Sequence, residues 1–171
     1  MDIQIRDMME SDILDFHKAF KLQGWDKPIK LFEKYYKEQK NGVRKVFIAV
    51  KGEQVLGYAT LLLNAQHGPF ANQHIPTVCD FNVLEKYQRK RVGTAIFNAI
   101  EDGVKKYSDK ICLGVGLHVG YGPAQRLYIK RGYIPDGSGV WYNNERLEPY
   151  AACTNNDDLV LYLSKDFTRK A

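Results

Sequence analysis

The sequence predicts an α+β fold in which helices cover both faces of a mixed, mostly antiparallel central sheet. Neighbouring strands with alternating patterns come early in the chain, and one strand-helix-strand-helix stretch comes late. The predicted order is β-α-α-β-β-β-α-β-α-β-β, which differs from the strict alternation of a doubly wound parallel fold. A length of 171 residues, without a repeat or a linker-like stretch, indicates one domain.

The first half of the chain predicts a strand, two helices and a hairpin. Gly24 and Pro28 separate the two helices, because glycine and proline interrupt helical segments. The pattern then loses its helical period, and a continuous apolar run over 46–50 predicts a buried strand, joined by a short turn to a second, longer strand. The elements are a strand around Ile3 and Ile5, a helix through Ile13, Phe16, His17 and Phe20, a helix through Leu31, Phe32, Tyr35 and Tyr36 that stops near Asn41-Gly42, and strands over 46–50 and 54–63.

The second half predicts a β-α-β-α stretch and a last antiparallel pair. Its first helix has the strongest pattern, with apolar residues along one face. A loop that holds His67 and His74 precedes the first strand of this half. The elements are a strand over 77–84, a helix over 92–107, a strand over 111–117, a helix over 124–130 and late strands over 139–142 and 158–163.

The composition limits the compartment and the partners. The three cysteines are odd in number, widely spaced and without a CxxC pattern, which predicts structural thiols in a cytoplasmic protein. The longest apolar run is far shorter than the about 20 residues of a membrane-spanning helix, and the first residues lack a signal-peptide pattern. We therefore expect no membrane partner. No His, Cys, Asp or Glu group has the spacing of metal ligands, so we expect no metal.

Basic residues gather where a strand ends and a long helix begins. Lys86, Arg89, Lys90 and Arg91 precede Gly93 at the start of that helix. Unpaired main-chain amides and the positive end of the helix dipole favour an anion there. The net charge of +5 permits such a partner, so we expect a phosphate site, with a solvated basic loop as the alternative.

Two other function classes lack their sequence signals. The Walker A pattern GxxxxGK[ST] is absent, which argues against a kinase or an ATPase. A nucleic-acid-binding face would spread basic and stacking aromatic residues along one surface, whereas here the basic residues concentrate at one helix start. We therefore expect no nucleic-acid partner.

Two segments resemble motifs of one enzyme superfamily. Residues 88–95, QRKRVGTA, follow a strand and resemble motif A of the GNAT N-acetyltransferases, with Arg91 in place of the first glycine. Residues 124–133, AQRLYIKRGY, resemble the motif B helix, although Tyr121 stands where the family often has asparagine. The resemblance implies a single GNAT-like domain over residues 1–167, a short polar tail over 168–171, and acetyl-CoA as the acetyl donor.

The resemblance also implies which residues hold acetyl-CoA. Main-chain groups of Phe81 and Val83 would pair with the pantetheine arm, and main-chain amides of the motif A loop would hold the pyrophosphate. At Arg91, a positive φ would cost about 1–2 kcal/mol; otherwise the guanidinium could add a phosphate contact, and we favour the second alternative. The implied cofactor-binding residues are Phe81, Val83, Gln88, Arg89, Lys90, Arg91, Val92, Gly93 and Thr94.

The implied reaction is direct attack of an amine on the thioester, which needs a base and a proton donor for the leaving thiolate. Tyr128 resembles the family's acid, with packing in the core as the alternative reading. Asp80, on the strand before motif A, and His118, at the end of the next strand, are candidates for the base. His67 and His74 are weaker candidates for the base. For Asp80, the alternative to the base role is a structural hydrogen bond at the end of its strand.

The sequence therefore predicts a cytoplasmic, acetyl-CoA-dependent N-acetyltransferase that acts through a ternary complex. The expected acceptor is a primary amine of a small metabolite such as an amino acid. The alternatives are a protein or antibiotic amine as the acceptor, and a non-catalytic domain that binds or senses acyl-CoA. Because the family often dimerises, the resemblance also allows a homodimer, for which the segment 140–142 could supply an apolar patch.

Overall fold

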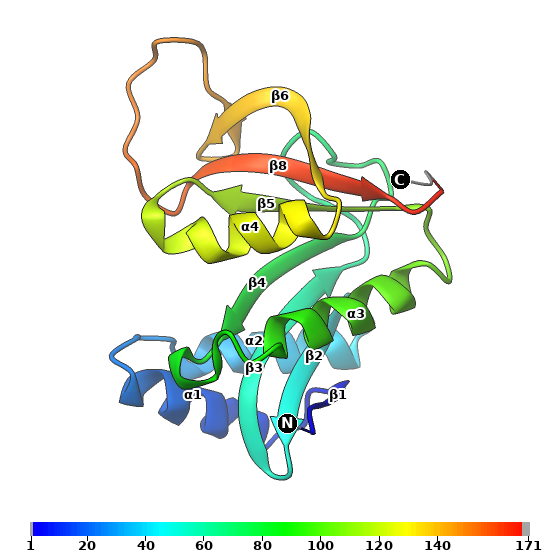
Figure 1. Ribbon diagram of the computed structural model, residues 1–171, viewed down its shortest axis with the longest axis vertical. Coiled ribbons are helices and arrows are strands. Elements are labelled where there is room, and N and C mark those ends of the chain that lie inside the picture. The colour runs from blue at the N-terminus through cyan, green and yellow to red at the C-terminus, as the bar shows by residue number, and fades with distance from the viewer. Residues whose placement is uncertain (1, 169–171) are drawn as a thin grey trace. The chain divides into compact units, whose positions relative to one another are not determined.

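The computed structural model describes residues 2–168, and its strands join in one mixed sheet (Figure 1). The sheet has eight strands in the order β1-β2-β3-β4-β5-β8-β6-β7. The predicted α+β class is confirmed. The elements are β1 (Gln4–Asp7), α1 (Asp12–Leu22), α2 (Ile29–Lys40), β2 (Arg44–Lys51), β3 (Gln54–Leu62), β4 (Thr77–Val83), η1 (Glu85–Tyr87), α3 (Val92–Val104), β5 (Lys110–Gly116), η2 (Val119–Tyr121), α4 (Gly122–Lys130), β6 (Ile134–Tyr142), β7 (Glu145–Arg146) and β8 (Leu159–Asp166).

The chain divides into two compact units. The first comprises the described residues up to Leu63 together with Cys79–Gly103, and the second comprises Asn64–Val78 with the described residues from Val104 onward. The predicted boundary of the domain at residue 167 stays a prediction. Of the predicted tail, Thr168 lies in a bend after β8, and residues 169–171 lie outside the described residues.

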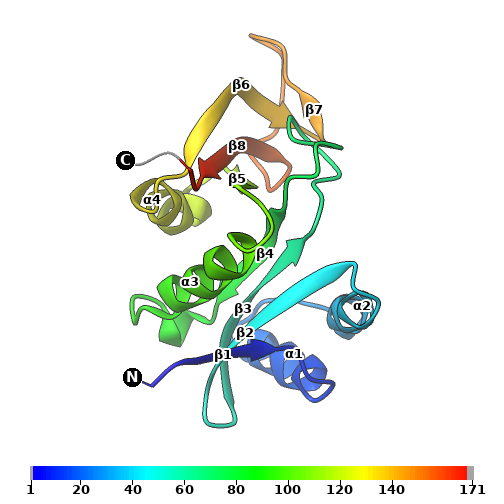
Figure 2. The ribbon, with the colours of Figure 1, turned by 90° about the vertical axis from the view of Figure 1, so that its right-hand side faces the viewer.

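The first unit is built around the antiparallel strands β1, β2 and β3. Figure 2 shows α1 and α2 on one side of these strands and α3 on the other. Phe16 and Phe20 of α1 and Phe32 of α2 are buried, and their rings stack and lie edge-on to Tyr58 of β3. This aromatic cluster is the core beneath α1 and α2, and it follows from the helical spacing of those residues in the sequence.

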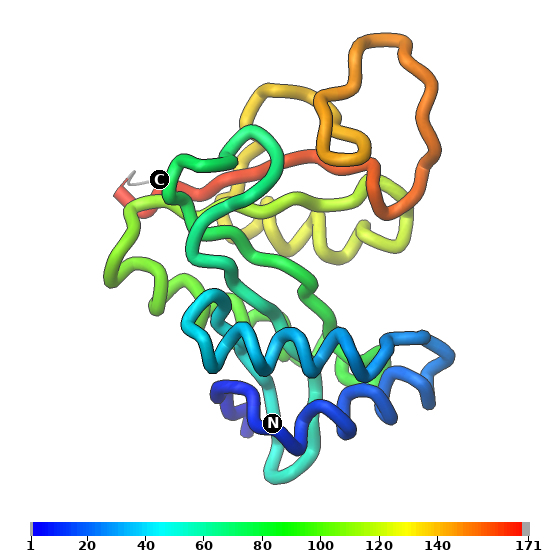
Figure 3. Tube along the Cα trace, turned by 180° about the vertical axis from the view of Figure 1, so that it is seen from behind, coloured from blue at the N-terminus to red at the C-terminus, as the bar shows by residue number. Residues whose placement is uncertain are grey.

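The second unit is an antiparallel arrangement of β5, β8, β6 and β7 with α4. Thr77 and Val78, the first residues of β4, pair in parallel with Cys112 and Leu113 of β5. Cys112 is buried beside Ala65 and Phe70, as expected of a structural thiol, whereas Cys153 is exposed. Cys153 lies in the long segment between β7 and β8, which loops outward in Figure 3.

Some predicted elements differ from the structure in their bounds, and one short strand was not predicted. The helix α3 ends at Val104 rather than at residue 107, because the amides of Tyr107 and Ser108 both turn back to the carbonyl of Val104. The strand β6 begins at Ile134 rather than at residue 139; a shift in its register with β8 accommodates Gly137 and Gly139, which have positive φ. The two-residue strand β7 is too short to give a sequence pattern.

Among residues 2–168, no helix combines the length and the apolar character that crossing a membrane requires.

The strand β3 passes very close to the end of β4 at Gly57. A Cβ atom at Gly57 would lie 2.6 Å from the carbonyl oxygen of Asn82 and 3.0 Å from Cα of Val83. Real Cβ atoms do not approach main-chain atoms so closely, so the position requires glycine for close approach rather than for its φ.

We expect Gly57→Ala to lower the free energy of unfolding by about 1–3 kcal/mol, because the new methyl group must push β4 away. Urea unfolding of the purified protein measures the change. The matched control is Gly103→Ala in α3, where a Cβ meets nothing within 4 Å. That variant should be neutral or more stable by up to about 1 kcal/mol. Equal stability of Gly57→Ala and the wild type would contradict the close approach.

Candidate functional site

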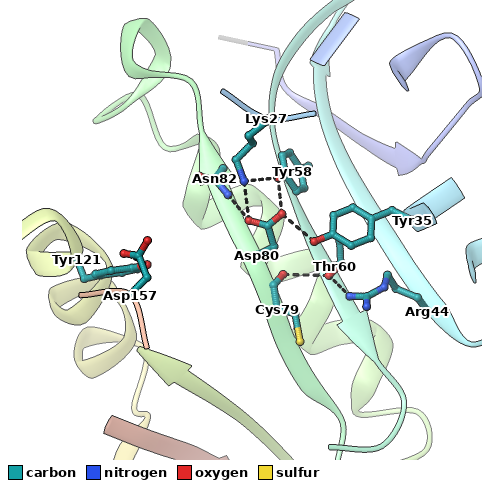
Figure 4. A network of polar contacts seen from close by, with 10 residues as sticks. All are labelled: Lys27, Tyr35, Arg44, Tyr58, Thr60, Cys79, Asp80, Asn82, Tyr121 and Asp157. Atoms are coloured by element: carbon teal, nitrogen blue, oxygen red, sulfur yellow. Dashed lines mark hydrogen bonds and ion pairs between the residues drawn. The ribbon is translucent and has the colours of Figure 1, made fainter. Parts of the chain in front are cut away.

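The carboxylate of Asp80 on β4 accepts four hydrogen bonds from side chains (Figure 4). Its Oδ1 accepts from Lys27 Nζ at 2.9 Å and from Asn82 Nδ2 at 2.7 Å. Its Oδ2 accepts from the hydroxyl groups of Tyr35 at 2.9 Å and Tyr58 at 2.6 Å. An ionised carboxylate offers about four acceptor positions, so these four donors fill it. We call these five residues the Asp80 cluster.

The donors of the Asp80 cluster come from four separate places in the fold. Lys27 lies between α1 and α2, Tyr35 on α2, Tyr58 on β3, and Asn82 two residues beyond Asp80 on β4. Residues 80 and 82 share one face of their strand because side chains alternate along β-structure. The other three donors are 22 to 53 positions away from Asp80 in the sequence.

The main chain at Asp80 is in the left-handed region, with a φ of 43°. For residues other than glycine this conformation costs about 1–2 kcal/mol, although aspartate tolerates it better than most. Next to it, the carbonyl oxygen of Cys79 accepts a hydrogen bond of 3.1 Å from the hydroxyl of Thr60. That hydroxyl accepts one of 2.6 Å from Arg44, whose Nε in turn donates to Glu38. Contacts on both sides of the unusual torsion therefore hold it in place.

The two phenols of the Asp80 cluster are neutral donors. Burial raises the pKa of Tyr35 and of Tyr58 well above the ordinary value, and the charge of Asp80 raises both further. With four donors in place, Asp80 offers no open acceptor position to an incoming amine. A role for Asp80 as the base stays a prediction, and it requires one of these donors to leave.

The loop between β4 and α3 has left-handed residues at alternate positions. Arg89 has a φ of 57° and Arg91 a φ of 65°, so the preference for an ordinary φ at Arg91 is wrong. The physical reason is the tight turn from η1 into α3, which Gln88 closes by donating from Nε2 to the carbonyl of Val83 at 3.2 Å. The side chain of Gln88 therefore positions the loop.

This loop can hold a polyanion. Left-handed residues at alternate positions point main-chain N–H groups toward one concave side, a pattern typical of anion sites. The first hydrogen bond at the start of α3 joins the amide of Ala95 to Arg91 at 3.0 Å, so the amides of Val92, Gly93 and Thr94 precede the helical ladder. Lys86, Arg89, Lys90 and Arg91 are exposed around them.

Tyr128 lies on α4 and is 6% exposed, beside Tyr133 at 6.0 Å between ring centroids. Burial raises the pKa of its hydroxyl, and Tyr121 raises it further. The phenol is therefore protonated at neutral pH, as a proton donor requires. Both readings of Tyr128 from the sequence, packing and proton donation, fit this position.

His118 has both ring nitrogens engaged. Its Nδ1 accepts a hydrogen bond of 3.1 Å from the amide of Gly120, so the neutral ring donates from Nε2 to Asp157 at 2.9 Å. The hydroxyl of Tyr121 also donates to Asp157, at 3.0 Å, and these two bonds lower the pKa of the carboxyl. The arrangement ties the segment before β8 to η2, and it leaves His118 without an open nitrogen for a base role.

The structure also explains why this chain has Tyr121. Its ring packs against Gly116, where a Cβ would lie 2.3 Å away, and stands edge-on to the His118 ring at 4.6 Å. The histidines at positions 67 and 74 are exposed in the loop before β4. Within the described part of the chain, no three His, Cys, Asp or Glu side chains are grouped to hold a metal ion.

Sequence reasoning missed most of the Asp80 cluster. Lys27, Tyr58 and Asn82 belong to no motif that indicates a site, and the spacing of Tyr35 predicts only a helix face. The available signal was weak: Tyr35 and Tyr58 place a polar hydroxyl at positions with an apolar pattern, and buried hydroxyls need partners.

Known proteins resemble this chain in sequence pattern and in fold. A sequence model of the acetyltransferase (GNAT) family matches residues 6–133. No curated protein sequence matches the chain.

Three solved structures illustrate the likeness in fold. The ribosomal-protein-S18-alanine N-acetyltransferase of Escherichia coli has a TM-score of 0.69 and 13% identity, over 99% of this chain and 97% of that one. The spermidine/spermine N-acetyltransferase SpeG of Vibrio cholerae has a TM-score of 0.66 and 15% identity, over 98% and 96%. The yncA protein of Salmonella typhimurium, with its cofactor acetyl-CoA, has a TM-score of 0.68 and 13% identity, over 99% and 96%.

We expect Asp80→Ala to lower the free energy of unfolding by about 2–4 kcal/mol. The substitution leaves the Lys27 ammonium and three other donors without their acceptor, and about a fifth of the Lys27 and Asp80 side chains is exposed, which moderates the loss. Urea unfolding at neutral pH measures it. Asp26→Ala, an exposed carboxylate beside Lys27, is the control and should change stability by less than about 0.5 kcal/mol. Similar losses in both variants would show that the cluster does not stabilise the fold.

Proposed function

The chain belongs to the acetyltransferase (GNAT) family, and from this premise we propose that it transfers the acetyl group of acetyl-CoA directly to a primary amine of a small metabolite. The observation that carries the proposal is the loop from Arg89 to Gly93, with its two left-handed residues and the start of α3. Main-chain amides and exposed cations meet there, and a pyrophosphate is a ligand of matching charge. Acetyl-CoA would supply the acetyl group as a reactive thioester.

The strand β4 supports the proposal for the pantetheine arm. The parallel pairing of β4 with β5 covers Thr77 and Val78. It ends before Asp80, whose main chain has a left-handed φ. We assign Phe81 and Val83 to the pantetheine arm through their main chain, as the motif implies. The amide of the following Leu84 donates to Leu56 at 3.0 Å, which anchors the end of the strand to β3.

The proposed chemistry is one acyl transfer. The amine nitrogen, once neutral, attacks the thioester carbonyl carbon; the new C–N bond forms and the C–S bond breaks. Tyr128 is the proposed proton donor to the leaving thiolate, because a phenol is protonated at neutral pH and can donate to sulfur. Asp80 is the proposed acceptor of the proton from the amine, and this role requires one of its four donors to leave.

A small amine fits the Asp80 cluster better than a protein amine does. The Asp80 side chain is 22% exposed, and the two phenols on its Oδ2 are buried. Solved relatives act, by their names, on spermidine and spermine or on a ribosomal protein, so their fold leaves the acceptor open. The recessed carboxylate favours the small acceptor, such as an amino acid.

We expect calorimetric titration to show saturable, one-to-one binding of acetyl-CoA that ATP does not reproduce. Arg91→Gly keeps a residue suited to positive φ and removes one cation, so it should weaken binding about three- to tenfold. Lys51→Ala, which removes a cation from the β2–β3 turn, should stay within about twofold of the wild type. Failure to saturate at millimolar acetyl-CoA would contradict the proposed donor, and dephospho-acetyl-CoA separates the contribution of the 3′-phosphate.

We expect Tyr128→Phe to lower kcat at least about tenfold while the Kd for acetyl-CoA changes by less than about twofold, because the ring remains and the donor is lost. Steady-state release of CoA thiol with a panel of primary amines measures kcat. Tyr107→Phe, a half-exposed tyrosine in the turn after α3, is the control and should keep the wild-type rate. An unchanged kcat in Tyr128→Phe would remove the proposed role. Acetyl-CoA binding without transfer to any amine would instead favour an acyl-CoA-binding domain.

A further inference from the structure

The ammonium group of Lys27 lies among a carboxylate, a hydroxyl group and two aromatic rings. Its Nζ lies 2.9 Å from Asp80 Oδ1 and 3.0 Å from the hydroxyl of Tyr58. The same atom lies 5.4 Å from the ring centroid of Phe20 and 5.6 Å from that of Tyr58. A carboxylate, a hydroxyl oxygen and two aromatic rings are the groups that recognise a primary ammonium.

We propose that this site binds the ammonium group of the acceptor amine, and that Lys27 is its built-in occupant, which the acceptor displaces. The inference rests on the proposed function, because that function requires a primary amine to enter. At neutral pH a primary alkylamine is an ammonium, and one that stands on a methylene carbon is the same chemical group as the end of the Lys27 side chain. The substrate class that follows is an unbranched primary alkylamine.

The side chain of Lys27 can leave without disturbing its loop. The carbonyl of Lys27 accepts a hydrogen bond of 2.8 Å from His17 Nδ1, and its amide donates to Trp25 at 3.2 Å. Trp25 is itself held by its ring, stacked on Phe20 at 5.8 Å, and by its amide, which donates to Phe20 at 3.0 Å. The main chain therefore stays in place, and the Lys27 side chain, 18% exposed, has a path to solvent.

The remaining cluster keeps its shape when the ammonium leaves. Asp80 retains Tyr35, Tyr58 and Asn82 as donors, so one acceptor position opens on Oδ1. The negative charge then lacks a compensating cation next to aromatic rings, and an uncompensated recessed charge is costly. The open site therefore favours one monovalent cation of the size of a methylammonium group.

Displacement would also free Asp80 for the chemistry. An acceptor ammonium at this position donates to Oδ1, where Lys27 donates in the present structure. Transfer of one proton to Oδ1 breaks an N–H bond, forms an O–H bond and leaves the neutral amine that attacks the thioester. One donor must leave Asp80, and Lys27 is the donor with the most flexible side chain.

The direct test uses n-butylammonium chloride, which reproduces the end of a lysine side chain, with no acetyl-CoA present. In the wild type the ammonium of Lys27 already occupies the site, so its removal in Lys27→Met should let the probe bind at least about tenfold more tightly. The variant Lys18→Met, an exposed lysine of α1, should keep the wild-type affinity. The double variant Lys27→Met/Asp80→Asn should lose the gain, and tert-butylammonium should bind more weakly to Lys27→Met than the unbranched probe does.

Calorimetry or line broadening of the probe's proton resonances measures the binding, and urea unfolding confirms that each variant is folded. If Lys27→Met does not fold, Lys27→Gln, which keeps a hydrogen bond donor, takes its place with the same expectation. Equal affinity in the wild type and in the Lys27 variants, or no saturable binding to those variants up to about 100 mM, would overturn the inference. Because the readout needs no acetyl-CoA, its failure is separate from a failure of the proposed acetyl transfer.

Discussion

Four side-chain donors converge on the carboxylate of Asp80, and the strand β4 takes its local form from that convergence. Asp80 keeps a φ of 43°, where most residues would be strained, because its carboxylate is held on one side and the Cys79 carbonyl on the other. Gly57 completes the arrangement by letting β3 approach the main chain of Asn82. The end of β4 therefore has a backbone path that no single strand would adopt alone, and the candidate cofactor loop starts from it.

The first unit contains two charged sites of opposite kind, one with balanced charges and one with an excess of positive charge. In the Asp80 cluster, one carboxylate meets one ammonium and two neutral phenols, so the recessed charges balance. In the loop from Lys86 to Arg91, four exposed cations lie at the start of α3. The first arrangement suits a cationic partner that replaces Lys27, and the second suits a polyanion. An acetyl transfer from a CoA thioester to an amine needs these two kinds of binding, which is why the proposed function and the Lys27 inference support each other.

Much of the fold could be predicted because its signals are local. Helical spacing identified α1, α2 and α3, and short apolar runs on either side of a turn identified β2 and β3, since these patterns reflect how one element is buried. The basic residues before Gly93 predicted the anion-binding loop for the same reason. The errors arose where local rules compete: the predicted strand began at Gly139, but β6 begins at Ile134 and continues through a shifted register, and Arg91 accepts a left-handed φ that a glycine would usually supply.

The sequence by itself determined the class of the fold, the order of its elements and the positions of the basic loop and of Tyr128, because each depends on residues that are neighbours along the chain. Only the tertiary structure decided what Asp80 does. Its partners Lys27, Tyr35 and Tyr58 lie 22 to 53 positions away, and their hydroxyl and ammonium groups meet the carboxylate through the packing of α1 and α2 on the sheet. Likewise, the engagement of His118 Nε2 depends on Asp157, 39 positions further along. Contacts between distant segments leave no periodic pattern in a single sequence, because only folding brings the two partners together.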